Sequence, residues 1–134
     1  MAKATFKRGE IRTAMYTTGA EETVAVDDIV MLGVVDSKKG KVGVARENIA
    51  AASTGIVAVS GVFEFPKIAD AVIKAGESVT WDDENDGVED NAHVPGEAEI
   101  CVVQFGAAMH DAGAATTVIN VDIQKPGVYT VGTQ

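Results

Sequence analysis

The feature that most constrains the fold is a strand-like alternation at the start of residues 61–82, GVFEFPKIADAVIKAGESVTWD. The polar Glu64 lies between Phe63 and Phe65, and successive side chains of a strand point to opposite faces, so the two rings share one face. Pro66 has no N–H to donate to a neighbouring strand and marks the end of this one. Nothing in the stretch is chemically reactive, which is typical of a packing unit.

After Pro66 the apolar spacing changes from that of a strand to that of a helix, and Gly76 is well placed to stop a helix. This pattern predicts one short α-helix near residues 67–75. Val79 and Trp81 share one face of the strand that follows, which favours Trp81 as a core residue over its alternative role as an interface anchor. The apolar positions of the expected helix are Ile68, Ala69, Val72 and Ile73.

Elsewhere the apolar period is mostly two, and glycine-rich turns separate the apolar runs. Gly55 and Gly61 interrupt one long run and suggest bulges or sharp bends. Many short strands of this kind predict a mainly β, compact, sandwich-like or small barrel-like domain. The expected strands cover residues 24–26, 29–35, 42–44, 54–65, 98–105, 116–123 and a short edge at 128–131, with a basic hairpin turn at 36–40.

Size and composition indicate one domain with its own core. The chain has 134 residues, of which 46% are hydrophobic and only 5% aromatic, so the core is expected to be rich in valine, isoleucine and alanine. The single cysteine, Cys101, excludes an intramolecular disulfide and lies in the apolar run 100–103, which is typical of a buried thiol. No apolar run approaches the roughly 20 residues of a membrane span, so we expect no membrane partner.

The net charge of −9 is unevenly distributed along the chain. Residues 1–46 hold eight Lys and Arg against six acids, whereas residues 47–134 hold three against fourteen. Nucleic-acid binding depends on neutralising phosphates with basic side chains, so such an acidic body argues against that partner. The basic start suits docking of a short arm on an acidic protein surface, although a merely solvated terminus is an equal alternative.

The acidic run 82–90 invites comparison with a calcium-binding loop, since Asp82, Glu84 and Asp86 fall at its first, third and fifth positions. The twelfth position, which needs a bidentate glutamate, is His93. A solvated hairpin loop is therefore the better interpretation, and a weak cation site the lesser one. Residues 33–42 lack the glycine spacing and the Ser or Thr of a phosphate-binding loop, which excludes nucleotide hydrolysis.

Candidate catalytic side chains are few. Cys101 lies in a strand pattern, whereas His93 and His110 lie in loops, so the three give no nucleophile and base pair. No serine has the spacing of a nucleophile elbow, and one Trp with two Tyr offers little stacking surface for sugars. We therefore expect no enzyme, no catalytic residue, no cofactor and no metal site.

The segment GVFEFPK, followed by AGESVTWD, resembles the signature of a phage family of capsid cement, or head-decoration, proteins. Residues 2–10 are similar to the short N-terminal arm of that family, residues 26–35 to its early strand pair, and residues 112–118 to its final strand. Two departures are the longer acidic insert at 82–90 and a tail after Ile123.

The resemblance implies a structural protein with an N-terminal arm at residues 1–12 and a single β-rich domain at 13–134. It implies binding to the major capsid protein on the outer surface of the assembled head, where the chain would stabilise contacts between capsomers as a homo-oligomer, with a trimer suspected. It also implies assembly in the host cytoplasm and location in the virion. The capsid-contact candidates are Lys3, Phe6, Lys7, Arg8 and Arg12. The alternative function is a soluble β-domain that binds a carbohydrate or a cation through the acidic 82–93 loop, in an adhesion role.

Overall fold

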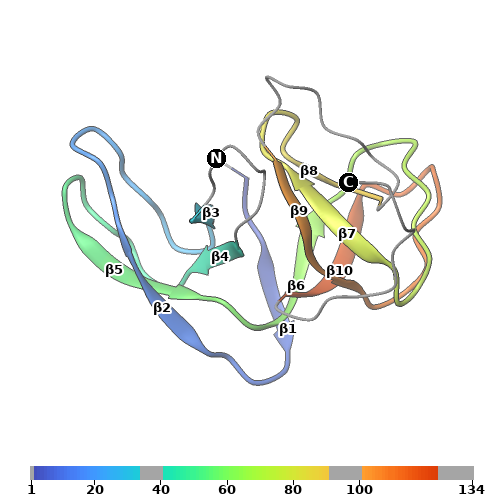
Figure 1. Cartoon of the computed structure of the whole chain (residues 1–134), viewed down its shortest axis with the longest axis horizontal. Coiled ribbons are helices and arrows are strands. Elements are labelled where there is room, and N and C mark those ends of the chain that lie inside the picture. The colour runs from blue at the N-terminus through green and yellow to red at the C-terminus, as the bar shows by residue number, and fades with distance from the viewer. Residues whose placement is uncertain (1, 34–40, 91–100, 124–134) are drawn as a thin grey trace.

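The computed structural model describes residues 2–33, 41–90 and 101–123, and within these ranges the chain forms ten β-strands and no helix (Figure 1). The strands belong to two antiparallel sheets, one of six strands and one of four. The expectation of a mainly β domain is therefore confirmed. The strands are β1 (Thr5–Arg8), β2 (Thr13–Thr17), β3 (Ile29–Leu32), β4 (Lys41–Ala45), β5 (Thr54–Ala58), β6 (Gly61–Pro66), β7 (Ser78–Asp82), β8 (Gly87–Glu89), β9 (Cys101–Ala108) and β10 (Val118–Ile123).

The six-stranded sheet has the order β1-β6-β10-β9-β7-β8 and curls into a half-barrel. Its curl brings the edge strand β8 back beside the end of β6, where Lys67 and Val88 form a parallel bridge. The amide of Ile68 donates to the carbonyl oxygen of Val88 at 3.1 Å. Gly87 permits this approach, because a Cβ there would collide with Ile68. Of the two predicted architectures, sandwich-like and barrel-like, the barrel-like one describes this sheet.

The four-stranded sheet has the order β2-β5-β4-β3 and is continuous in sequence with the other sheet. The chain leaves β5, bends at Gly61 and enters β6, and Gly61 has a φ of 113°, a region that glycine adopts most easily. The predicted bend at Gly61 is confirmed. Gly55 is different, because it pairs in register with Tyr16 and its missing side chain leaves room for Ile49.

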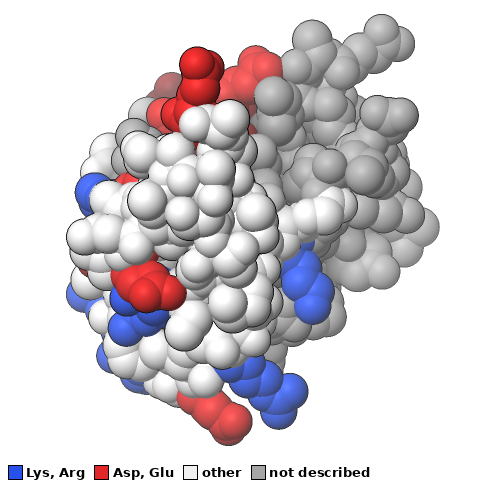
Figure 2. All heavy atoms as spheres, turned by 90° about the vertical axis from the view of Figure 1, so that its left-hand side faces the viewer, with Lys and Arg blue, Asp and Glu red and all other residues white. Residues whose placement is uncertain are grey.

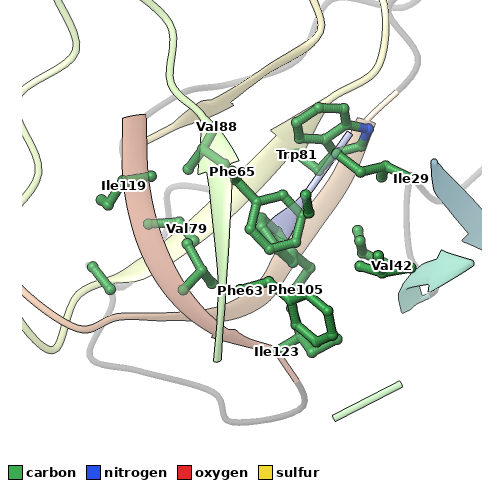
Figure 3. Packing of buried hydrophobic residues seen from close by; sticks show 14 of the residues in the cluster. Ile29, Val42, Phe63, Phe65, Val79, Trp81, Val88, Phe105, Ile119 and Ile123 are labelled. Carbon is green, nitrogen blue, oxygen red and sulfur yellow. The ribbon is translucent and has the colours of Figure 1, made fainter. Parts of the chain in front are cut away.

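The main core lies between the curled sheet and one face of the four-stranded sheet (Figure 3). The ring centroid of Phe65 is 5.2 Å from that of Phe105 and 6.0 Å from that of Trp81. Phe63, Phe65 and Trp81 are fully buried, which confirms the shared face of the two phenylalanines and the core position of Trp81. Cys101 is buried as well.

A second, smaller cluster covers the opposite face of the four-stranded sheet. It consists of Val24, Val30, Ala45, Ile49 and Val57. Tyr16 packs at its edge, and its hydroxyl donates to Glu22 Oε2 at 2.8 Å. Burial, this hydrogen bond and the charge of Glu22 raise the pKa of Tyr16 to about 12. Residues 18–28 and 46–53 supply part of this cluster, so both faces of the four-stranded sheet are covered by apolar packing near its centre.

The predicted α-helix near residues 67–75 is wrong, because the segment forms a turn at residues 68–71 and then runs extended beside Ala112. Its burial alternates: Ala71 and Ile73 are buried, whereas Val72 between them is 49% exposed. The amide of Ile73 donates to the carbonyl oxygen of Ala112 at 2.9 Å, and Ala112 returns a bond to Ile73 at 2.8 Å. So short a segment cannot sustain a helix without packing support, and bonds to neighbouring chain replace the helical ones.

Lys67 also stabilises the non-helical conformation of this segment. Its side chain is buried, and its ammonium donates to the carbonyl oxygens of Ile68 at 2.8 Å and Ala71 at 2.6 Å. These bonds fix carbonyl groups that a helix would otherwise use. Gly76, expected as the helix stop, has a φ of 85° and lies in the turn from Lys74 to Glu77. The expected edge at 128–131 and the turn at 36–40 lie outside the described residues.

Candidate functional site

The N-terminal segment runs along both sheets. The amide of Ala4 donates to the carbonyl oxygen of Asp27 at 3.0 Å, and Ile29 donates to Ala2 at 2.9 Å. Ala4 is fully buried in the main core. The chain then enters β1, which pairs with β6 in the six-stranded sheet. The division of the chain at residue 12 stays a prediction, and the described part of residues 1–12 is paired with the domain over much of its length.

Lys3 and Asp28 join this segment to the four-stranded sheet. Lys3 Nζ is 2.6 Å from Asp28 Oδ1, and the amide of Ala25 donates to Asp28 Oδ2 at 2.8 Å. Burial raises the pKa of Asp28, but the hydrogen bonds from Lys3 and Ala25 and the charge of Lys3 outweigh it and hold that pKa below its ordinary value. The carboxylate is therefore fixed in its charged form at neutral pH.

Phe6 packs at the border of the main core. Its ring meets that of Phe63 edge-on at 5.5 Å between centroids, and 36% of the residue remains exposed. The guanidinium of Arg46 lies 5.8 Å from the centroid of Phe6 and 6.0 Å from that of Phe63. Arg46 also pairs with Asp27 at 3.9 Å. Sequence analysis missed Arg46, because nothing local links it to a residue 40 positions earlier.

The other three candidates are exposed around one turn. Lys7 and Arg8 end β1, and Arg12 immediately precedes β2. Lys7 Nζ is 3.7 Å from Glu64 Oε2, and Arg12 Nε is 3.9 Å from Glu10 Oε1. Ion pairs of this length in solvent contribute little to stability, so these cations lose little when they exchange partners. Together the three form the basic turn of the molecule.

A groove of about 530 Å³ lies between the basic turn, the β5–β6 bend and the end of β10. Its lining includes Glu10, Arg12, Ser60, Asp122 and Ile123. Ser60 Oγ accepts a hydrogen bond from the amide of Arg12 at 2.7 Å and donates to the carbonyl oxygen of Glu10 at 2.9 Å. These bonds hold the backbone of the turn against the β5–β6 bend.

The acidic run 82–90 forms the β7–β8 hairpin, and Asp82 holds its turn. Asp82 Oδ1 accepts from the amides of Glu84 at 3.1 Å and Asn85 at 3.2 Å, and its Oδ2 accepts from Asn85 Nδ2 at 2.8 Å. Asp83 Oδ1 accepts from Trp81 Nε1 at 3.1 Å. The described residues hold no cluster of three or more Asp, Glu, His or Cys arranged for a metal ion. His93 lies outside the described residues, and the carbohydrate alternative for the 82–93 loop stays a prediction.

Cys101 and His110 are not brought together. Cys101 begins β9, whereas His110 lies two residues beyond its end at Ala108, so the strand separates them. His110 is exposed, and its Nε2 accepts from the amide of Asn120 at 3.0 Å. The resemblance of residues 33–42 to a phosphate loop falls mostly outside the described residues, and the flanking β3 and β4 pair as antiparallel strands.

The comparisons with known proteins agree with this architecture. The model of the phage cement protein family matches residues 7–123. The comparisons with curated proteins and with solved structures give no match. No helix in the described part of the chain is long and apolar enough to cross a membrane. Since the match covers most of the chain and nearly every strand, the protein belongs to the phage cement protein family, whose members are structural components of the phage capsid.

Proposed function

We propose that this chain binds the outer surface of the assembled phage head and stabilises the contacts between neighbouring capsomers. Its partner is the major capsid protein, and the basic turn is the part that contacts it. The observation that carries this assignment is the exposure of Lys7, Arg8 and Arg12 around one turn of a chain whose net charge is −9. An acidic patch on a capsomer is the complementary surface.

Lys3 and Phe6 serve this proposal indirectly. Lys3 is paired with Asp28, and Phe6 packs on Phe63, so both hold β1 against the domain. A strand fixed in this way presents Lys7 and Arg8 from a rigid edge, which lowers the entropy lost on binding. Several copies bound to one lattice gain further from avidity, and three copies on a local threefold axis would engage adjacent capsomers together.

The test is co-sedimentation of the purified chain with empty, expanded heads. The test variant combines Arg8→Glu with Arg12→Glu, and the matched control combines Lys41→Glu with Lys74→Glu, two exposed lysines outside the basic turn. Each pair changes the net charge equally. We expect the wild type and the control to saturate the heads at a ratio commensurate with the lattice, and the test variant to lose most of its binding.

Equal binding by all three proteins would contradict the role of the basic turn. Equal loss of binding in both variants would also contradict it, because net charge alone would then explain the loss. Absence of wild-type binding would contradict the proposed function itself. Deletion of residues 1–12 is less informative, because it removes β1 and the buried Ala4 along with the cations. Far-UV circular dichroism of each variant checks that the sheets remain intact.

A further inference from the structure

Two sheets have four edges; in the described structure two of them are protected along their length and a third, β3, at its first residue. The β1 edge carries Lys7 and Arg8 and has a register shift between Phe6 and Arg8. The β8 edge has three residues and is met by Ile68, and the start of β3 is covered by residues 2–4. Charge, bulges, shortness and cover are the devices by which proteins prevent edge strands from pairing. The β2 edge, TAMYT, has no charge, proline or bulge.

The backbone of β2 presents a complete set of pairing groups on its outer side. Arg12 accepts from the amide of Val59 at 2.8 Å, and the amide of Thr18 donates to Ser53 at 2.8 Å, in register with the β2–β5 ladder. Even-numbered residues therefore bond to β5, since bonding alternates along an antiparallel strand. The amides and carbonyls of the odd-numbered residues, Thr13, Met15 and Thr17, face away from β5.

Met15, the central one of these residues, and its β5 partner Ile56 form a small open apolar strip, flanked by Thr13 and Thr17. Met15 is 63% exposed, and Ile56, its partner in register on β5, is 39% exposed. Figure 2 views the molecule from the side on which Figure 1 draws β2 and β5, and most of the described surface in that view is uncharged. An uncharged strip along an unprotected edge is a surface that buries readily against another strand.

The strand that fits this edge best is β2 of a second copy, and we infer that two copies pair antiparallel through β2 about a two-fold axis at Met15. This register places Thr13 opposite Thr17 of the other copy, which is a favourable cross-strand pair. It aligns the outward amides and carbonyls of the odd-numbered residues and joins the two apolar strips. The result is one continuous eight-stranded sheet built from two four-stranded ones.

The antiparallel direction follows from the two-fold axis, which sets opposite ends of β2 beside each other. Arg12 precedes the strand, Glu21 lies in the turn that follows it, and Glu10 Oε1 is 3.9 Å from Arg12 Nε. Because Glu10 offsets the charge of Arg12, the register of the outward backbone groups carries the pairing and charge does not.

Five residues per strand make a small interface, and interfaces below about 1,200 Å² are typical of weak, transient association. Disulfide trapping detects such a contact. In a hydrogen-bonded antiparallel pair, opposite Cα atoms lie about 5.5 Å apart, which suits a disulfide. We expect Met15→Cys to form covalent dimers under mild oxidation. Thr13→Cys is the matched control, because the two Thr13 positions lie about 13 Å apart in this register.

The double variant Thr13→Cys with Thr17→Cys restores the opposed pair, and we expect it to cross-link as Met15→Cys does. Buried Cys101 is present in every variant and cancels from the comparison. Equal cross-linking by Met15→Cys and Thr13→Cys alone would mean random collision, and no cross-linking by either would mean no contact. Either result overturns the inference, and neither bears on binding to heads.

A charge swap gives a second, reversible test. Met15→Lys sets two ammonium groups face to face on the axis, and Met15→Glu sets two carboxylates there. We expect sedimentation equilibrium to show concentration-dependent association of the wild type, its loss in each variant alone, and its return in an equimolar mixture of the two variants. A wild type that stays monomeric overturns the inference. Val72→Lys, another exposed apolar position, should associate like the wild type. Failure of the mixture to associate overturns the two-fold geometry.

Discussion

The two sheets of this protein use their side chains differently. The six-stranded sheet curls back on itself and buries the ring of Phe65 against those of Trp81 and Phe105. The centre of the four-stranded sheet packs against the same core, but Met15 and Ile56 at its β2–β5 end are exposed to solvent. The difference indicates a division of labour: the curled sheet determines stability, whereas the open sheet keeps surface available for contacts.

The largest expected effect compares one residue from each sheet. Phe65→Ala should lower the free energy of unfolding by about 3–5 kcal/mol, because it leaves a cavity among Trp81 and Phe105. Ile56→Ala should change it by no more than about 0.5 kcal/mol, because that side chain is 39% exposed. Urea denaturation followed by circular dichroism measures both. Similar losses at the two positions would contradict the division of labour.

Sequence patterns predicted seven of the ten described strands and missed β1, β2 and β8. The expected strand at 24–26 is wrong as well, because only Val24 pairs there, in an isolated bridge with Ile49. β10 alternates along its whole length and was expected from residues 116–123. β1 is exposed at all four positions, so only its backbone pairing with β6 makes it a strand, and no apolar period announces it. The wrong helix prediction near 67–75 has the opposite cause. The apolar residues there have helical spacing, but the segment pairs with neighbouring chain and forms no helix.

The candidate site shows the same limit. Local charge was enough to select Lys7, Arg8 and Arg12, which are exposed around one turn. It was not enough to separate them from Lys3, whose ion pair with Asp28 spans 25 positions. The open β2 edge was also missed, because edge position depends on the order of strands in a sheet, which a local pattern does not contain.

A middle-sized effect tests how the curled sheet closes. Lys67→Met keeps most of the side-chain volume but removes the bonds to the carbonyl oxygens of Ile68 and Ala71. We expect a loss of about 1–3 kcal/mol, because buried carbonyls are left without those donors. Lys74→Met, at an exposed position of the following turn, is the control and should stay within about 0.5 kcal/mol. An equal, small change in both would show that Lys67 does not stabilise the closure at β8.

The smallest effect tests the link between the two sheets, and it depends on pH. The folded-state pKa of Asp28 lies below its ordinary value, so the unfolded chain binds a proton at this carboxylate before the folded chain does. The ion pair with Lys3 therefore stabilises the fold above the unfolded pKa of about 3.9 and loses that contribution as pH falls through the lower, folded pKa.

Asp28→Asn removes this contribution, and we expect it to cost about 1 kcal/mol or less near neutral pH, because Lys3 is 55% exposed at its side chain. The difference between wild type and variant should shrink when urea denaturation is repeated below pH 4 or so. Asp86→Asn, in the exposed β7–β8 turn, is the control and should show no such convergence. A difference that persists or grows in acid would mean that Asp28 acts through its hydrogen bond to Ala25, with the link to Lys3 contributing nothing.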